Sequence, residues 1–167
     1  MMLKKNAWVL LSTLLLLLSG CGFHFANQGG IEPAFQTMKL QSSDPYGYLS
    51  REVRNQLHLH QVKLVEQGEV PELRMKNSQI SSAVVSVFKQ GREAEKLLTL
   101  NLSASLYVPG RGEFPINIRN TRTFFDDSRA ALAKSAEQDA IYNDMRAQAA
   151  RQLMIKIISL QNQLAVK

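Results

Sequence analysis

The chain has 167 residues, a formal net charge of +6, and contents of 45% hydrophobic and 20% charged residues. This length suits a single domain, and the hydrophobic content excludes disorder over the whole chain. The single cysteine excludes an internal disulfide and a structural zinc site built from several thiolates.

The first twenty residues differ in character from the rest. Two lysines precede a nearly uninterrupted apolar run over residues 7–18. A helix that spans a bilayer needs about 20 apolar residues, so this run has the length of the hydrophobic region of a secretory signal. The Leu18-Ser19-Gly20-Cys21 segment that follows resembles the bacterial lipobox. Residues 1–20 are therefore predicted to be a signal peptide; the alternative is a signal anchor with an incidental cysteine.

The lipobox implies that Cys21 becomes the first residue of the mature protein. Its sulfur would carry S-diacylglycerol and its new amino group an N-acyl chain. Because each buried methylene contributes roughly 0.8 kcal/mol, several acyl chains attach a protein stably to a bilayer. Gly22 stands where aspartate retains lipoproteins at the inner membrane. By resemblance to that sorting rule, the outer membrane is the expected location.

The first part of the mature chain is predicted to be a tether, and the remainder one domain. Residues 21–35 contain glycines and a proline without a clear hydrophobic period, which is typical of a tether; the domain is expected over residues 36–167. Short strands are predicted over residues 37–41 and 62–65. Between them, apolar residues at four-residue spacing predict a helix over residues 46–59, with Asp44 as its cap and Pro45 at its start.

The middle of the chain has β character. Every second side chain is apolar over residues 98–108, which predicts a strand with one buried and one polar face. Two further long strands are expected over residues 73–88 and 114–125. Because the turns at residues 89–92 and 109–112 are short, the three strands should form an antiparallel meander.

The last predicted element is a long helix that begins with a capping box over residues 135–138. Its apolar residues form one stripe: Ile141, Met145, Ala149, Leu153, Ile157, Leu160 and Leu164. Together these elements predict an α+β two-layer sandwich. Two helices should pack on one face of a mainly antiparallel four-stranded sheet and leave the other face open.

No catalytic or metal-binding pattern stands out. His58 and His60 are two residues apart on a predicted helix and so point in different directions, which is a poor spacing for a metal pair. Asp126 and Asp127 are adjacent, as in a turn or helix cap. Motifs for nucleotide binding, nucleophilic catalysis and metal-dependent hydrolysis are missing from the sequence. We therefore predict a protein that is not an enzyme, has no catalytic residue, metal or cofactor, and carries only the covalent lipid on Cys21.

Basic residues are concentrated near the predicted turns. Lys89 and Arg92 lie in one turn, Arg111 lies in the next, and Lys134 lies near the last helix. Solubility alone could explain each of them, and the alternative is an anion-binding edge. Nucleic acid is excluded as the partner because the chain is exported and lacks aromatics interleaved for base stacking. Phosphorylated lipids of the outer membrane are the remaining anions, and both lysine and arginine bind phosphate.

Several segments in order resemble the lipopolysaccharide-assembly lipoprotein family called LptE. They are Gly22-Phe23-His24, Asp44-Pro45, Val53-Arg54-Asn55-Gln56-Leu57, Ser86-Val87-Phe88-Lys89-Gln90-Gly91, Val108-Pro109-Gly110-Arg111, Phe124-Phe125-Asp126-Asp127 and Ala131-Leu132-Ala133-Lys134. The resemblance implies a non-enzymatic protein that plugs the lumen of a large outer-membrane β-barrel, lipopolysaccharide-assembly protein D. Such a protein helps the barrel fold, binds lipopolysaccharide and takes part in its insertion into the outer leaflet. The expected location is the outer membrane, with the lipid-anchored domain inside the barrel lumen and facing the periplasm.

The resemblance also implies which residues bind lipopolysaccharide. Lys89 occupies the basic position after the Ser-Val-Phe strand, and Lys134 the basic position after the Ala-Leu-Ala run. Arg92 and Arg111 are added as their neighbours by turn position. Two alternatives to the assembly function are a stand-alone structural envelope lipoprotein and a cell-envelope hydrolase.

Overall fold

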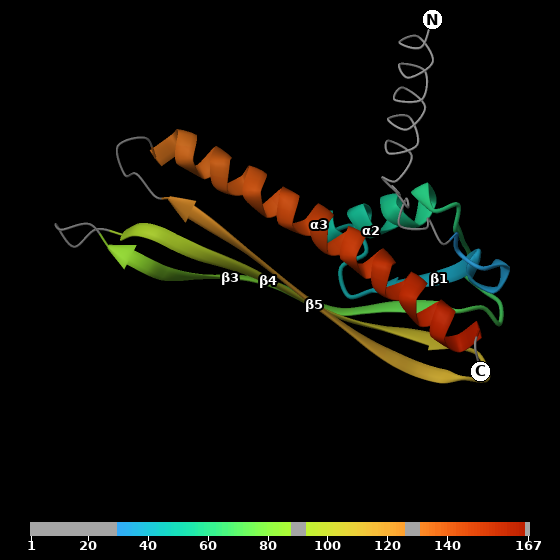
Figure 1. The fold of residues 1–167 in the computed structure, drawn as a ribbon. Helices are drawn as coiled ribbons and strands as arrows, with labels where there is room; N and C mark the ends of the chain where they lie inside the picture. The colour runs from blue at the N-terminus through green and yellow to red at the C-terminus, as the bar shows by residue number, and fades with distance from the viewer. Residues whose placement is uncertain (1–29, 88–92, 126–130, 166–167) are drawn as a thin grey trace, which may run out of the picture.

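The computed structural model describes residues 30–87, 93–125 and 131–165. Two helices lie over one face of a long, twisted sheet (Figure 1). The elements in chain order are η1 (Pro33–Phe35), β1 (Thr37–Ser42), α2 (Tyr48–Leu59), β2 (Lys63–Leu64), β3 (Glu72–Val87), β4 (Glu93–Val108), β5 (Gly112–Phe125) and α3 (Ala131–Ala165). The predicted α+β sandwich is thus confirmed. In this part of the chain, neither helix combines the length and the hydropathy needed to cross a membrane.

The sheet differs in detail from the one expected. Its described part has five strands rather than four, in the order β2-β1-β3-β4-β5. The three long strands form the predicted antiparallel meander, whereas β1 runs parallel to both of its neighbours. The parallel pairing follows from α2, because a helix between two strands carries the chain back across the sheet before it pairs again. The fifth strand is β2, which has only two residues.

The strand pairing leaves β3 with one partner over most of its length. β4 pairs with β3 from Glu72 to Val87, but β1 pairs with it only from Glu72 to Met75. In the described residues, β3 beyond Met75 is therefore an edge of the sheet. This edge projects past the short strands, as the long hairpin at the left of Figure 1 shows.

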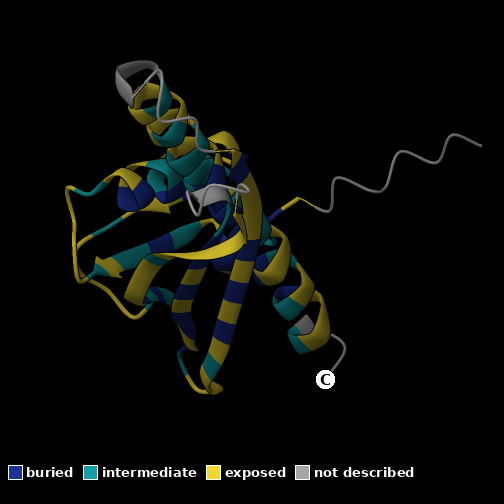
Figure 2. Ribbon diagram, turned by 90° about the vertical axis from the view of Figure 1, so that its left-hand side faces the viewer, coloured by how far each residue is buried: buried dark blue, intermediate teal, exposed yellow. Residues whose placement is uncertain are grey.

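The core lies between the sheet and the helices. Alternate residues of β4 point into it, so buried and exposed positions alternate along the strands (Figure 2). Four residues of the predicted stripe on α3 are fully buried, namely Met145, Ala149, Leu153 and Ile157. Full burial of one Leu or Ile side chain contributes about 1.5–3 kcal/mol, so this interface between helix and sheet supplies much of the stability.

Both helices begin at positions other than those predicted. α2 begins at Tyr48 with Gly47 as its cap, so Asp44 and Pro45 precede it. The backbone carbonyl of Asp44 accepts a hydrogen bond of 2.6 Å from the Ser50 hydroxyl, and this contact holds a turn ahead of the helix.

α3 begins at Ala131, so the capping box expected at residues 135–138 lies inside the helix. The four residues from Ala131 to Lys134 are strong helix formers, which explains the additional turn.

The start of the domain is held by a buried glutamine. The Gln161 side chain is fully buried; its Nε2 donates to the Gly30 carbonyl at 3.0 Å, and its Oε1 accepts from the Glu32 backbone N–H at 3.3 Å. Ile31 and Phe35 are buried beside it in the core. Residues 30–35, which the sequence assigned to the tether, therefore contribute to the packed domain.

Candidate functional site

Two of the predicted lipopolysaccharide-binding residues, Lys89 and Arg92, lie outside the described residues, as does Cys21. The residues that flank Lys89 and Arg92 in the sequence are described. Val87 pairs with Glu93 on either side of these two, and Phe125 at the end of β5 pairs with Glu95. We call this end of the sheet, where β3 and β5 end and β4 begins, the hairpin end.

Lys134 lies at the hairpin end, in the first turns of α3. Its Nζ is 2.7 Å from Glu137 Oε2 and 5.5 Å from the centroid of the Phe124 ring. The Lys134 side chain is 24% exposed, and that of Glu137 is 49% exposed. An ion pair at a surface of this kind contributes only about 0–1 kcal/mol. A phosphate with more than one negative charge can therefore compete with Glu137 for the Lys134 ammonium.

Arg111 lies at the opposite end of the sheet. Its guanidinium donates a hydrogen bond to the backbone carbonyl of Leu164, near the end of α3. The 14 residues of β5 separate the two ends, which at about 3.3 Å per residue is roughly 45 Å. Arg111 therefore does not share a site with Lys134. Successive turns of a meander lie at opposite ends of its strands, and this geometry separates the two predicted turns.

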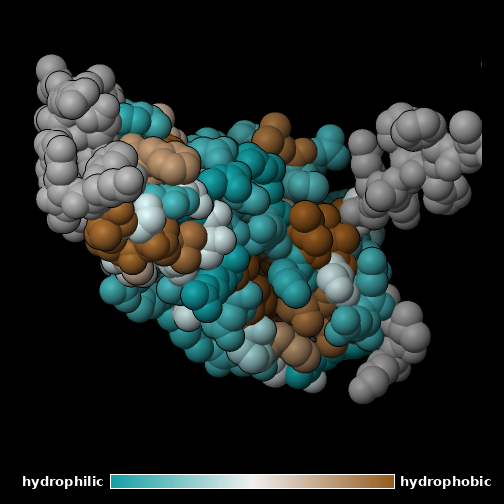
Figure 3. Space-filling view, turned by 60° about the vertical axis from the view of Figure 1, so that its left-hand side comes forward, coloured by the Kyte–Doolittle hydropathy of each residue, from teal (hydrophilic) through white to brown (hydrophobic). Residues whose placement is uncertain are grey.

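The hairpin end also exposes apolar side chains that were not among the predicted site residues. Val84, Val85, Val87 and Phe125 are all exposed; Val87 and Phe125 are 62% and 63% exposed. Apolar surface gathers at this end in the space-filling view (Figure 3). The signal in the sequence is the run over residues 83–87, where the alternation of apolar and polar residues breaks down. Exposed apolar residues grouped in this way commonly mark a surface that binds a partner or a lipid.

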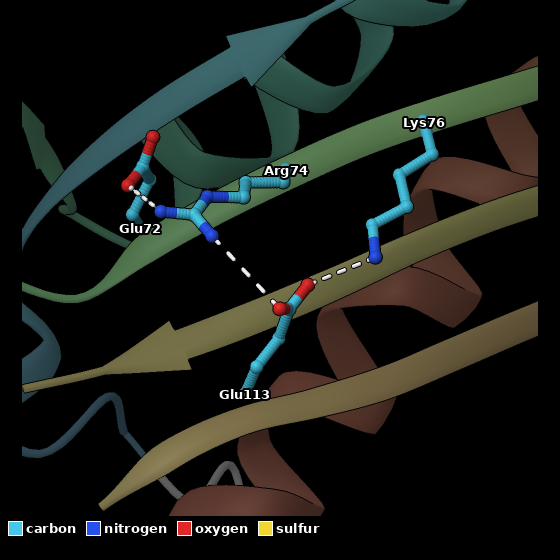
Figure 4. Close-up of polar contacts among 4 residues, drawn as sticks. All are labelled: Glu72, Arg74, Lys76 and Glu113. Carbon is cyan, nitrogen blue, oxygen red and sulfur yellow. Dashed lines mark hydrogen bonds and ion pairs between the residues drawn. The ribbon is translucent and has the colours of Figure 1, made fainter.

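A second charged cluster lies on the face of the sheet away from the helices (Figure 4). Arg74 is 2.8 Å from Glu72 and 3.9 Å from Glu113, and Lys76 is 2.9 Å from Glu113. The Arg74 guanidinium also lies 5.1 Å from the centroid of the Tyr107 ring. Two acids and two bases balance each other here, so this cluster links β3 to β5 and leaves no net charge for an anion.

The electrostatics of this cluster agree with that role. The nearby Ser105 hydroxyl, followed by the Lys76 ammonium, holds the pKa of Glu113 below its ordinary value of 4.5. The Glu72 carboxylate raises the pKa of Arg74 above its ordinary value. Both shifts favour the charged forms of Arg74 and Glu113.

The fold is one found in bacterial lipoproteins. A solved structure of rare lipoprotein B from Shewanella oneidensis matches 77% of this chain and 98% of its own, with 34% sequence identity and a TM-score of 0.73. A lipoprotein B from Nitrosomonas europaea shares the fold at 20% identity and a TM-score of 0.67. The class of protein is therefore a lipoprotein domain with a two-layer α+β architecture.

Sequence comparison gives the family. The model of the LptE family, described as lipopolysaccharide-assembly, matches residues 35–157. The LPS-assembly lipoprotein LptE of Pectobacterium atrosepticum is 41% identical over 95% of this chain and 88% of its own, and that of Photorhabdus laumondii is 40% identical over 92% and 86%. The chain belongs to the LptE family, which confirms the identification made from the sequence motifs. It is accordingly a non-enzymatic lipopolysaccharide-assembly lipoprotein, and membership of this family implies anchoring in the outer membrane.

Proposed function

We propose that this protein plugs the lumen of lipopolysaccharide-assembly protein D, the lipopolysaccharide-translocating β-barrel, and binds lipopolysaccharide at its hairpin end. One observation supports the lipid contact above the others. A lysine with a weakly held partner, Lys134, lies at the same end of the sheet as the exposed side chains of Val84, Val85, Val87 and Phe125. Cations beside apolar surface match a ligand that carries phosphates next to acyl chains.

Charge in the sequence adds to this surface. Lys89 and Arg92 belong to the segment that joins β3 to β4 at the hairpin end, so the chain supplies further cations there. Lysine offers phosphate a point charge, and arginine can add two parallel hydrogen bonds. Arg111 is left out of the proposed lipid site because its guanidinium is engaged with α3 at the opposite end.

The other face of the sheet supports the proposed plug. Most of its exposed residues on β4 and β5 are polar, among them Asn101, Ser103, Asn117, Arg119, Thr121 and Thr123, whereas Tyr107, Pro115 and Phe125 are exposed exceptions. The interior of an outer-membrane barrel is polar, so a largely polar sheet face is compatible with packing against it. The lipid on Cys21 would attach the complex to the membrane from the periplasmic side.

The lipid contact can be tested by charge reversal on the purified lipoprotein. We expect Lys89→Glu combined with Lys134→Glu to weaken lipopolysaccharide binding, with an unchanged circular dichroism spectrum. Lys156→Glu is the matched control, because Lys156 is an exposed lysine on the same helix and distant from the hairpin end.

A third variant tests the competition at Lys134. Glu137→Gln removes the carboxylate that now pairs with Lys134, so it should strengthen lipopolysaccharide binding. Equal affinities for the double variant and the Lys156→Glu control would contradict the assignment of the site.

A further inference from the structure

The free edge of β3 has none of the features that usually protect such an edge. From Asn77 to Val84 it pairs only with β4 in the described structure, so every second residue turns its backbone N–H and C=O away from the sheet. Charged residues, prolines and bulges commonly prevent another strand from pairing with an edge. These eight residues contain no charge and no proline, and the register shifts lie only on either side of them.

The opposite long edge, on β5, is protected. It contains Pro115, Arg119 and Arg122, and Arg122 pairs with Asp144 of α3 at 3.2 Å. The contrast shows that this sheet protects one long edge and leaves the other open.

A groove follows the open edge. Two cavities of about 210 Å³ each lie beside β3, in line with the end of β1. Leu49, Ser78 and Arg146 line both cavities, so the two adjoin each other; Ser42 lines the first, and Ile80 and Tyr142 line the second. An added strand in this groove would continue the line of β1 along β3. At about 3.3 Å per residue, the eight-residue edge is roughly 26 Å long.

An unneutralised guanidinium lies over this groove. The Arg146 guanidinium carbon is 5.5 Å from the centroid of the Tyr48 ring and 5.8 Å from that of Tyr142, and its Nη1 donates to Asn143 Oδ1 at 2.9 Å. In the part of the chain that the structure describes, no carboxylate forms an ion pair with it.

The protein's own carboxylates near the groove repel a ligand carboxylate more strongly at one end than at the other. Asp44 lines only the first cavity, at the Ser42 end, and Glu52 lines a neighbouring cavity with Arg51 and Arg146. A carboxylate from a ligand is therefore most favourable at the end of the groove near Ile80, away from Asp44.

We propose that the β3 edge from Asn77 to Val84 is a docking site for an extended, acidic segment of a partner polypeptide. The segment adds as a strand beside β3, and its carboxylate binds Arg146. Backbone hydrogen bonds supply affinity in such strand addition, and side-chain contacts supply specificity. A second copy of this edge is a poor occupant, because residues 77–84 contain no acid. The inference does not depend on the lipopolysaccharide contacts: the two surfaces share only Val84, the last residue of the edge, and the groove and Arg146 lie outside the proposed lipid site.

A designed peptide tests the docking site on the purified, full-length lipoprotein in detergent. The probe is a fluorescent eight-residue peptide of alternating threonine and valine with one glutamate, and its control carries lysine in place of the glutamate. We expect fluorescence anisotropy to show roughly tenfold tighter binding of the glutamate peptide, as for one charge-assisted hydrogen bond. Arg146→Gln should abolish this preference and leave lipopolysaccharide binding unchanged.

The groove itself is tested by Ser78→Lys, which fills both cavities. It should lower the affinity for the glutamate peptide at least tenfold, whereas Ser103→Lys, an exposed position on the opposite face of β4, should not. Hydrogen exchange should show protection by the peptide over residues 77–84.

Two outcomes would overturn the proposal. Equal binding of the two peptides, or binding that Ser78→Lys leaves intact, would refute the acidic docking site. A dimer that Ser78→Lys dissociates would assign the edge to a second copy of the chain instead.

Discussion

The buried side chain of Gln161 gives a quantitative test of how the domain holds its N-terminal segment. It makes two hydrogen bonds to the backbone, at Gly30 and Glu32, and no part of it is exposed. Gln161→Leu fills a similar volume but cannot form either hydrogen bond. The Gly30 carbonyl and the Glu32 N–H would then lose their partner at a partly buried position.

The expected loss of stability follows from two possible responses. If the segment stays in place, two backbone groups lose their partner at about 1–3 kcal/mol each, towards the low end for the longer bond to Glu32. If the segment detaches, the two groups regain water but Ile31 leaves the core, which costs about 1.5–3 kcal/mol. The smaller of the two costs determines the result, so Gln161→Leu should lower the free energy of unfolding by about 1.5–3 kcal/mol.

Urea denaturation followed by circular dichroism measures this change. Gln163→Leu is the matched control, since Gln163 is exposed on the same turn of α3, and its effect should stay within about 0.5 kcal/mol. Hydrogen exchange should accelerate at residues 30–32 in Gln161→Leu if the segment detaches. A Gln161→Leu protein as stable as the Gln163→Leu control would show that the buried glutamine does not hold the segment.

Three further predictions concern pH, packing and lipid attachment. Because the pKa of Glu113 is lowered in the folded state, its carboxylate stabilises the fold above pH 4.5, and this stabilisation is lost as pH falls through the folded-state pKa. Glu113→Gln should therefore lower the free energy of unfolding at pH 7, and its difference from wild type should shrink towards pH 3. A difference in free energy of unfolding that does not depend on pH would contradict this. In chemical denaturation, Leu153→Ala should lower the free energy of unfolding by about 2–5 kcal/mol, and Ile155→Ala, on the exposed face of α3, by less than about 0.5 kcal/mol. Similar losses for the two variants would show that α3 does not pack on the sheet through Leu153. Cys21→Ala should abolish labelling with radioactive palmitate, and persistent labelling would refute the lipobox.

Much of the fold can be predicted because hydrophobic period reports burial directly. Alternation over residues 98–108 predicted the buried face of β4, and four-residue spacing predicted the buried stripe of α3. The helix starts were predicted less well, since local contacts such as that of Ser50 with the Asp44 carbonyl decide them. The parallel position of β1 depends on long-range pairing, which a local pattern does not encode.

The candidate site was predictable in part. Charge and family motif selected Lys134, which stays a prediction as a lipid-binding residue. The sequence could not show its pairing with Glu137, because helical spacing brings these two residues together only when the helix starts at Ala131. Arg111 looked like a similar turn residue, and the length of β5 places it at the far end. The open edge of β3 could not be predicted from the sequence, because it exists only where β1 stops pairing with β3, and this pairing is long-range.

The proposed role of this lipoprotein as the plug of an outer-membrane barrel is tested most directly by affinity purification of the natively lipidated protein from outer membranes in mild detergent. We expect co-purification, in a stable complex of equal proportions, of a large β-barrel protein whose gel mobility changes on heating. Recovery of the lipoprotein as a lone monomer would contradict this role and favour a stand-alone envelope lipoprotein.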